Sequence, residues 1–358
     1  MLVIDAAAVR TLYPMTEAIA DMRTAFTLYS SGRVRQPQRC MTPGAAEGEV
    51  LATMPAYVPS TADGTGNGEA GAYGGGFGVK IIAVQPGNPA RGLDPHPGAV
   101  LLLDPVTCVP LALLDATSIT EIRTAAASAV ATDLLARKDA EVLAVLGTGA
   151  QAREHIRAIS RVRPLREIRV WGRTPVRART LADECASLLP TSSDRTTALW
   201  VTRAAEAVAG ADVICTVTAA VEPVLDSAWV APGTHINAVG AVFPGRRELT
   251  GDLVARSAVL TDSRESALTE AGDLLVPMRE GRLTAGHIRG EIGEVLLGTC
   301  AGRTSDDEIT VFESLGLAVQ DVISAHSVHR RAVGEGTGID ITLSAPGGTA
   351  ALRQGIQA

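Results

Sequence analysis

The chain has 358 residues, 46% of them hydrophobic and 20% charged, which is the balance of a soluble globular protein with room for two domains. A net charge of -7 and 3% aromatic residues supply neither the basic surface nor the stacking rings that nucleic-acid binding usually needs, so we expect no nucleic-acid partner. No stretch approaches the roughly 20 apolar residues of a membrane helix, and no basic N-terminal stretch leads into an apolar run. We therefore expect a cytoplasmic protein without a membrane partner. The five cysteines are far apart and include no Cys-x-x-Cys pair, which indicates neither a disulfide framework nor a zinc site.

The first third of the chain predicts one helix followed by short strands. Residues 14–31 carry apolar side chains at the spacing of one helical face, and Pro14 suits a first turn. Short apolar runs separated by Pro or Gly predict strands of one mixed sheet at residues 39–42, 50–54, 79–84, 100–103 and 111–114. The glycine-rich stretch at 59–78 predicts a surface loop, and its part from Gly64 to Gly78 is a candidate lid over a pocket.

The rest of the chain alternates between strand and helix patterns. Ser118 and Glu121 have the spacing of a capping box, so a long alanine-rich helix that joins two domains should start at Ser118. Strands are predicted at 142–146, 168–171, 199–202, 213–217, 235–239 and 309–313, with a final helix at 315–331 and a loosely held C-terminal segment. This alternation predicts an α/β fold: a Rossmann-type doubly wound parallel sheet at residues 118–314, plus a second α/β domain with a mixed sheet, formed by residues 1–117 with 315–358.

A glycine turn marks the expected dinucleotide site. An apolar strand at 142–146 runs into Gly147-Thr-Gly149-Ala-Gln-Ala152 and then a helix. Gly147 permits the tight turn, Gly149 lets the backbone approach a pyrophosphate, and Ala152 keeps the helix close to its strand, while the helix N-terminus offers free N–H groups to the anion. The strand before, the helix after and a second strand at the expected distance make this motif more specific than an isolated G-x-G-x-x-A.

The second strand of this unit bears on the choice of cofactor. It ends in Trp171-Gly-Arg-Thr174, where an NAD enzyme usually carries an acidic residue for the ribose hydroxyls. Arg173 and Thr174 suit a 2′-phosphate instead, because a guanidinium makes charge-assisted hydrogen bonds to phosphate. We therefore favour NADPH over NADH as the cofactor.

Four motifs together resemble the ornithine cyclodeaminase and mu-crystallin family. They are Met54-Pro-Ala-Tyr57, Arg123-Thr-Ala-Ala126, Leu146-Gly-Thr-Gly-Ala-Gln-Ala152 and His235-Ile-Asn-Ala-Val-Gly240, and the likeness runs from about residue 10 to residue 330. The stretches Glu222-Pro-Val, Arg247-Glu-Leu249 and Phe312-Glu-Ser-Leu-Gly316 look nearer to the mu-crystallin ketimine reductases than to the cyclodeaminases. The resemblance implies a homodimer whose N-terminal domain forms the subunit contact and much of the substrate pocket.

The resemblance also implies which side chains hold the substrate. In this family two arginines and a lysine bind the substrate carboxylate, and the matching positions are Arg39, Lys80 and Arg123. Lysine within an apolar strand is costly unless it has a partner or a lowered pKa, which favours a functional role for Lys80. The further residues expected at the cofactor are Thr124, Thr148, Ala150, Gln151, Thr216, Thr218, Val239 and Ser314.

Two departures from the family pattern argue against a cyclodeaminase. Such enzymes carry an acidic residue just after the Ala-Val-Gly turn, where this chain has Ala241 and Val242. The glutamate that they carry shortly before Met-Pro is also missing, with Ala52 at the nearest match. Val242 can neither transfer a proton nor hold an ammonium group, so loss of ammonia from ornithine is not supported.

We thus expect NADPH-dependent reduction of small α-imino acids, such as cyclic ketimines, to α-amino acids. Carboxylate anchoring should fix the substrate for hydride transfer, and either Lys80 or an ordered water should donate the proton. Three alternatives stay open: an amino-acid or opine-type dehydrogenase acting on an open-chain imine, an ornithine cyclodeaminase that keeps NAD and releases ammonia, and a protein that binds NADPH and a small ligand without turnover. His326 and His329 lie at helical i, i+3 spacing but have no third ligand nearby, so no metal is expected.

Overall fold

The computed structural model describes residues 1–60, 74–190 and 196–343. Residues 61–73, which include most of the predicted lid, and the C-terminal segment from 344 lie outside this part of the chain. The end of the predicted loop is wrong, because Gly76 to Gly78 already belong to a strand, where close neighbours favour residues without a side chain. A Cβ on Gly78 would approach Val322 to 2.8 Å.

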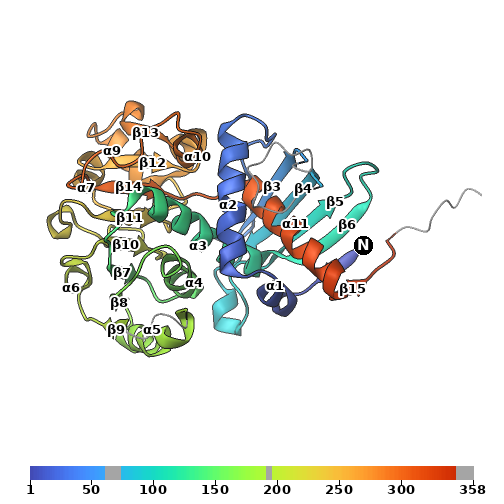
Figure 1. Ribbon diagram of the computed structural model, residues 1–358, viewed down its shortest axis with the longest axis horizontal. Coiled ribbons are helices and arrows are strands. Elements are labelled where there is room, and N and C mark those ends of the chain that lie inside the picture. The colour runs from blue at the N-terminus through green and yellow to red at the C-terminus, as the bar shows by residue number, and fades with distance from the viewer. Residues whose placement is uncertain (61–73, 191–195, 344–358) are drawn as a thin grey trace, which may run out of the picture.

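Strands in the described residues form two sheets (Figure 1). The first is the predicted mixed sheet, with seven strands in the order β15-β1-β6-β5-β4-β3-β2. Only the pair β1 and β6 is parallel, and the other pairs are antiparallel. The bounds are β1 Leu2–Ile4, β2 Cys40–Pro43, β3 Val50–Val58, β4 Gly76–Val84, β5 Gly98–Leu103, β6 Pro110–Asp115 and β15 Ile339–Asp340.

One face of the mixed sheet packs on helices. Period-2 alternation sends Ala52, Met54 and Ala56 of β3 inward. The helices α1 (Ala6–Leu12), α2 (Met15–Ser30) and α11 (Ala318–Glu335) close this side, and α11 crosses the strands in Figure 1. The helix predicted at 14–31 is thus confirmed, and α11 begins three residues later than predicted.

The second sheet is the predicted doubly wound parallel sheet. Within the described ranges it has eight strands in the order β13-β12-β14-β11-β10-β7-β8-β9, and every pair is parallel. The bounds are β7 Val142–Leu146, β8 Glu167–Trp171, β9 Thr197–Trp200, β10 Val213–Thr216, β11 His235–Ala238, β12 Ala258–Thr261, β13 Ile288–Glu291 and β14 Thr310–Glu313. The sequence did not reveal β12 and β13, and β9 lies two residues earlier than predicted.

Helices cover both faces of this sheet. Alternate residues of β7 enter two different hydrophobic clusters, Leu143 and Val145 on one side, Ala144 and Leu146 on the other. The first side is covered by α3 (Ala116–Leu135), α4 (Ala150–Ile159) and α5 (Pro175–Leu188), and the second by α6 (Ala204–Val208), α7 (Gly251–Ala255) and α9 (Gly272–Arg279). The remaining α-helices of the described part are α8 (Arg264–Glu270) and α10 (Ile292–Leu296). Because the first cluster continues into α2, α11 and the mixed sheet, the domain boundaries at 117 and 314 stay a prediction.

Helix α3 lies between the two sheets and is held at both ends. The capping box predicted at Ser118 is wrong: the N-cap is Asp115, whose carboxylate accepts the Ser118 N–H at 2.7 Å. Asp115 ends β6, so the strand itself delivers a capping side chain and the helix starts two residues earlier than predicted. At the other end, two arginines donate to the free backbone carbonyl oxygens. Arg163 donates to the carbonyl oxygens of Thr132 and Ala136, and Arg303 donates to that of Leu135 at 2.6 Å.

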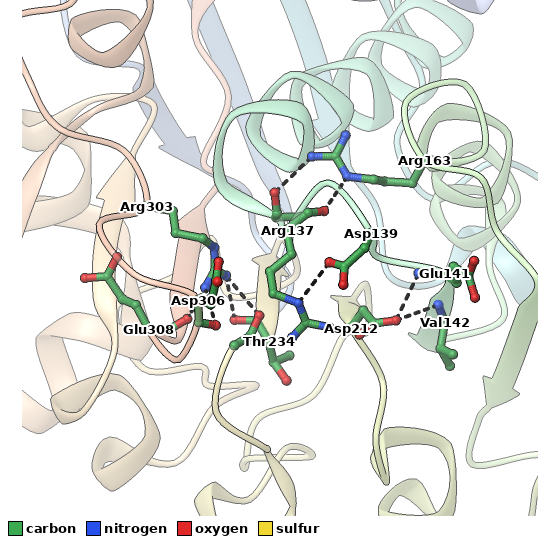
Figure 2. A network of polar contacts seen from close by, with 12 residues as sticks. Arg137, Asp139, Glu141, Val142, Arg163, Asp212, Thr234, Arg303, Asp306 and Glu308 are labelled. Carbon is green, nitrogen blue, oxygen red and sulfur yellow. Dashed lines mark hydrogen bonds and ion pairs between the residues drawn. The ribbon is translucent and has the colours of Figure 1, made fainter.

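Figure 2 shows the arginines around this C-terminal end of α3, at the amino edge of the parallel sheet. Arg137, just after the helix, pairs with Asp212 at 2.5 Å, and Asp212 accepts the N–H groups of Glu141 and Val142 at the start of β7. The helix is therefore fixed to the amino edge of the sheet, while its N-terminal half reaches the site described next.

Candidate functional site

The glycine turn after β7 has the geometry that the motif predicted. Gly147 has a φ of +137°, and a Cβ there would lie 2.7 Å from the Val217 carbonyl oxygen, so only glycine fits. Gly149 is the N-cap of α4, with no side-chain cap, and among the described residues no atom would lie within 4 Å of a Cβ on it. The free N–H groups at the start of α4 thus face open space, as anion binding requires.

The turn after β8 touches the glycine turn. A Cβ on Gly172 would lie 2.6 Å from the Thr148 side chain, so the two turns pack closely. Arg173 follows, is exposed, and makes no ion pair or side-chain hydrogen bond within the part of the chain that the structure describes. Thr174 is the N-cap of α5 but does not cap it with its side chain. Both polar groups are therefore available to a ligand beside the glycine turn.

Further predicted cofactor residues line the same edge of the sheet. The strand register pairs Thr216 with Ala238 and Ala238 with Glu313, which places Thr216, Val239 and Ser314 side by side at the carboxyl ends of β10, β11 and β14. Ser314 is buried, and its hydroxyl has no hydrogen-bond partner among the described residues. A buried hydroxyl without a partner is costly, which fits a ligand at this edge. Thr218 differs, because its N–H and hydroxyl both donate to Glu248 at 2.6 Å.

Lys80 and Arg123 meet at one carboxylate. Lys80 is on the inward face of β4, and its Nζ lies 2.8 Å from one oxygen of Asp321 on α11. Arg123 of α3 donates from Nε to the other oxygen at 3.0 Å and from Nη1 to Gln320 at 2.9 Å. All of these side chains are at least nine-tenths buried, so the ion pairs are shielded from water.

Arg39 joins this group from the segment just before β2. It pairs with Glu270 at 2.9 Å and donates to the carbonyl oxygens of Leu315 and Gly316, in the turn between β14 and α11, at 2.6 and 3.1 Å. Gly316, with a φ of +85°, lies against Arg123, because a Cβ there would be 2.7 Å from Arg123 Nη1. Arg39 and Arg123, predicted from separate motifs, therefore lie against one turn, and Lys80 contacts Asp321 in the helix that follows it.

Thr120 connects the cationic group to the glycine turn. Its hydroxyl lies 3.5 Å from Lys80 Nζ, and its carbonyl oxygen lies 3.5 Å from the side-chain nitrogen Nε2 of Gln151, a residue in the first turn of α4. Thr124, one helical turn further along α3, is buried. Thr120 thus brings Lys80, a predicted substrate residue, and Gln151, a predicted cofactor residue, next to each other.

Burial lowers the pKa of Lys80 from its ordinary value to about 8. Asp321 opposes this effect by favouring the charged amine, while Arg123 and Arg39 add to it by repulsion. Lys80 therefore remains largely protonated at neutral pH and can release its proton within a short pH range above it.

A second buried group, of carboxyls, was not predicted from the sequence. Glu248 accepts the Gly240 N–H at 2.7 Å as well as both Thr218 donors, and Asp273 at the start of α9 accepts the N–H groups of Glu248 and Leu249. Glu313 ends β14 nearby, and its Oε2 has no partner among the described residues. Burial raises the pKa of Asp273 to about 8, and it raises the pKa of Glu313 well above the ordinary value, with repulsion from Asp273 and Glu248 adding to the effect.

The described residues contain no group of three or more His, Cys, Asp or Glu side chains placed to hold a metal ion. Among the helices that the structure describes, none combines the length and the apolar character needed to cross a bilayer.

Comparison with known proteins shows the family of the chain. The model of the Ornithine cyclodeaminase/mu-crystallin family matches residues 1–336. The chain is similar to Delta(1)-pyrroline-2-carboxylate reductase of Bacillus cereus, with 39% identity over 94% of this chain and 98% of that one. It is also similar to the ketimine reductase mu-crystallin of Mus musculus, with 37% identity over 88% and 90%.

Two solved structures are similar along nearly the whole chain. One is Thermococcus litoralis Delta(1)-pyrroline-2-carboxylate reductase in complex with NADH and L-proline, with a TM-score of 0.87, 34% identity and coverage of 95% of this chain and 100% of that one. The other is an archaeal alanine dehydrogenase dimer with bound NAD, with a TM-score of 0.86, 32% identity and coverage of 96% and 99%.

The buried carboxyls generate a prediction about stability. In the unfolded chain Glu313 ionises near its ordinary pKa of 4.5, whereas in the fold its raised pKa keeps it protonated. The free energy of unfolding therefore falls as pH rises from about 4.5 towards the raised pKa. Glu313→Gln, which cannot ionise, should match the wild type at pH 4 and be about 1–3 kcal/mol more stable at pH 8.

Urea unfolding at the two pH values measures this difference. The exposed Glu47→Gln variant is the control and should behave as the wild type at both. A Glu313→Gln protein that is less stable than the wild type at pH 8 would show that the ionised carboxylate is favourable in the fold.

Proposed function

Since the chain belongs to the ornithine cyclodeaminase/mu-crystallin family, we propose that it reduces small α-imino acids, cyclic ketimines foremost, to α-amino acids with a nicotinamide dinucleotide. The observation that carries the proposal is the group of buried Lys80 and Arg123 with half-buried Arg39, which Thr120 connects to the glycine turn. A carboxylate brought into such a site gains paired, charge-assisted hydrogen bonds in a shielded environment. The reductases among the relatives are named for Δ1-pyrroline-2-carboxylate, a cyclic imino acid, and for ketimines, and one solved structure of the first kind holds NADH and L-proline.

The residues present fit a dinucleotide. Gly149 leaves the N-terminus of α4 open, Gly172 brings the second turn against the first, and Ser314 Oγ, at the same edge of the sheet, lacks a partner among the described residues. A bound dinucleotide supplies a hydride to the imine carbon.

The protein's part in the reaction is anchoring and proton transfer. Arg39 and Arg123 orient the substrate carboxylate, and holding the imine in a reactive position is worth several kcal/mol of the barrier, about 7 kcal/mol in favourable cases. Lys80 donates a proton from Nζ to the imine nitrogen, so an N–H bond of Lys80 breaks and one of the product forms. The neutral amine of Lys80 then takes a proton from solvent. A pKa of about 8 suits this role, because the group is charged before the reaction and can be regenerated after it.

The assay follows NADPH and NADH oxidation with Δ1-pyrroline-2-carboxylate, Δ1-piperideine-2-carboxylate and pyruvate plus ammonia, and ammonia release from L-ornithine with NAD. We expect fastest oxidation with a cyclic imino acid. Lys80→Met should lower kcat/KM by about 100-fold or more, because it removes the proton donor and one of the three cations. Lys138→Met is the matched control, since Lys138 is the other lysine of the chain and its side chain is 80% exposed.

Other results of this assay identify the alternatives. Preference for pyruvate plus ammonia would indicate an amino-acid dehydrogenase, which the similarity to the archaeal alanine dehydrogenase favours as the second candidate. Ammonia from ornithine would indicate a cyclodeaminase and would contradict the argument from Val242. Tight NADPH binding without any turnover would indicate a ligand-binding protein.

We further propose that NADPH is preferred over NADH. Support comes from Arg173, which is exposed and makes no side-chain contact to a carboxylate in the described ranges, and from Arg177, which is exposed one helical turn later. Neither an Asp nor a Glu occupies residues 171–174, so a 2′-phosphate meets cations and no acid there.

Arg173→Ala should raise the KM for NADPH about tenfold or more and leave the KM for NADH within about twofold, because a charge-assisted bond to phosphate is worth about 1.5–3 kcal/mol. Steady-state kinetics with each cofactor measures this. Arg179→Ala, within α5 and paired with Asp183, is the control. Equal losses with both cofactors would contradict a 2′-phosphate site.

A homodimer through the mixed sheet is also proposed. The face of this sheet turned away from α11 is apolar and continuous across β3, β4, β5 and β6, because the register aligns the row Thr53, Ile81 and Ala99 and the row Pro55, Val79, Leu101 and Leu113. Phe77 is 50% and Ile81 42% exposed, which is unfavourable unless another surface covers them. A second copy fits best, since a solved relative is a dimer and the face is too apolar for a solvated one.

Ile81→Asp should convert the dimer to a monomer, since it introduces a charge at the centre of this face. Light scattering should then give a mass near the 37.0 kDa of one chain in place of twice that value. Val106→Asp, at a residue 88% exposed between β5 and β6, should leave the dimer intact. A dimer that persists in Ile81→Asp would place the contact elsewhere.

A further inference from the structure

We propose that Asp321 is a positioning residue that acts through Lys80, holding its amine against Arg123 and keeping it charged until substrate arrives. This inference rests on the proposed function in so far as it concerns catalysis. Asp321 touches neither of the glycine turns, and its effect on the reaction is exerted through the two cations that it joins.

The geometry gives Asp321 a bridging position. It lies in the first turn of α11, fully buried, and each oxygen contacts a different cation, Lys80 from β4 and Arg123 from α3. The side-chain oxygen of Gln320, the preceding residue, accepts two hydrogen bonds. One comes from Arg123 Nη1 at 2.9 Å and the other from the Leu317 N–H at 3.0 Å. One end of α11 therefore fixes the relative position of two side chains from two separate elements.

The charges around Lys80 explain why a carboxylate is needed. The charged groups that act on it are Asp321 from α11, Arg123 from α3 and Arg39 from the segment before β2. Two of these three are cations. A fully buried amine between two guanidinium groups loses its proton, unless a carboxylate opposes the repulsion and the loss of water. Glu270 does not serve Lys80, because it pairs with Arg39.

The amino-acid composition supports the importance of this proton. The chain has two lysines and thirty arginines, so arginine supplies nearly all of its positively charged side chains. Arginine does not release a proton near neutral pH, whereas a buried lysine does. A lysine at the centre of a site whose other cations are arginines indicates that the site uses a proton from this position. Asp321 then determines the pH range in which Lys80 carries that proton.

The small number of lysines makes a direct test possible. With lysine labelled at Cε, an NMR titration should show two signals, the exposed Lys138 and the buried Lys80. We expect Lys80 to titrate clearly below the ordinary value for a lysine in the wild type yet to be protonated at pH 7. In Asp321→Asn its pKa should fall by about one unit or more, the usual effect of removing an opposite charge at contact distance.

Two further variants separate charge from packing. Asp321→Glu retains the charge and should leave the pKa of Lys80 near the wild-type value. Gln320→Ala loosens the same turn and frees Arg123 without changing charge, so it should raise the KM and leave the pKa of Lys80 unmoved. In the pH profile of kcat/KM, the alkaline limb should move to lower pH in Asp321→Asn only, so that its deficit is smaller at pH 6 than at pH 8.

An unmoved Lys80 signal in Asp321→Asn, or the same shift in Gln320→Ala, would overturn the proposal. If Asp321→Asn does not unfold cooperatively on heating, the wild-type titration decides, because a Lys80 already neutral at pH 7 would show that Asp321 does not keep it charged. The titration needs no substrate. Failure of the wild type to reduce any imino acid would therefore refute the proposed function and leave the NMR result on Asp321 to be judged by itself.

Discussion

Neutralising buried positive charge is the constraint on which the arrangement of this protein depends. Taking an ion out of water costs several kcal/mol, on the order of 20 kcal/mol in the idealised limit, unless partners replace the water. The partners of the three cations come from both sides of the molecule: Asp321 from α11, and Glu270 from α8, which belongs to the parallel-sheet side. The charges thus bind the two sheets together as well as forming the site.

Most of these contacts between the two sides of the molecule meet at the turn between β14 and α11. Its carbonyl oxygens accept from Arg39, and its N–H groups at Leu315 and Gly316 donate to Asp262, which follows β12, at 2.8 and 2.5 Å. Immediately before the turn stands Glu313, a member of the buried carboxyl group. Within three residues the chain therefore passes from a group of buried carboxyls to a turn that contacts the guanidinium groups of Arg39 and Arg123.

The sequence was sufficient for the parts of this structure that local motifs encode. The glycine turn, the strand and helix alternation, and the positions of Lys80 and Arg123 follow from short stretches whose physical reason is local or from likeness to a family. Asp321 did not stand out in the sequence, because an acidic residue in the first turn of a helix is ordinary. Its partners are also distant in the chain, since Arg123, the nearer of the two, is 198 residues away. Glu248, Asp273 and Glu313 come from three separate segments, and only the fold brings them together.

The elements that were predicted wrongly from the sequence also have local causes. Ser118 and Glu121 satisfy the capping-box spacing, but Asp115 comes first along the chain, and Glu121 pairs with Arg10 instead. Strands β12 and β13 are four residues each, too short for periodicity to distinguish them from loops.

Helix α3 has a consequence for how this protein can change over evolution. Its 20 residues span about 30 Å, with Thr120 and Arg123 near one end and the carbonyls held by Arg163 and Arg303 at the other. Because the helix is held at its far end, a small displacement there is transmitted along the helix axis to Thr120 and Arg123. Substitutions at the amino edge of the parallel sheet can therefore shift Thr120 and Arg123 while both residues stay the same, which gives selection a means of adjusting the candidate site from a distance.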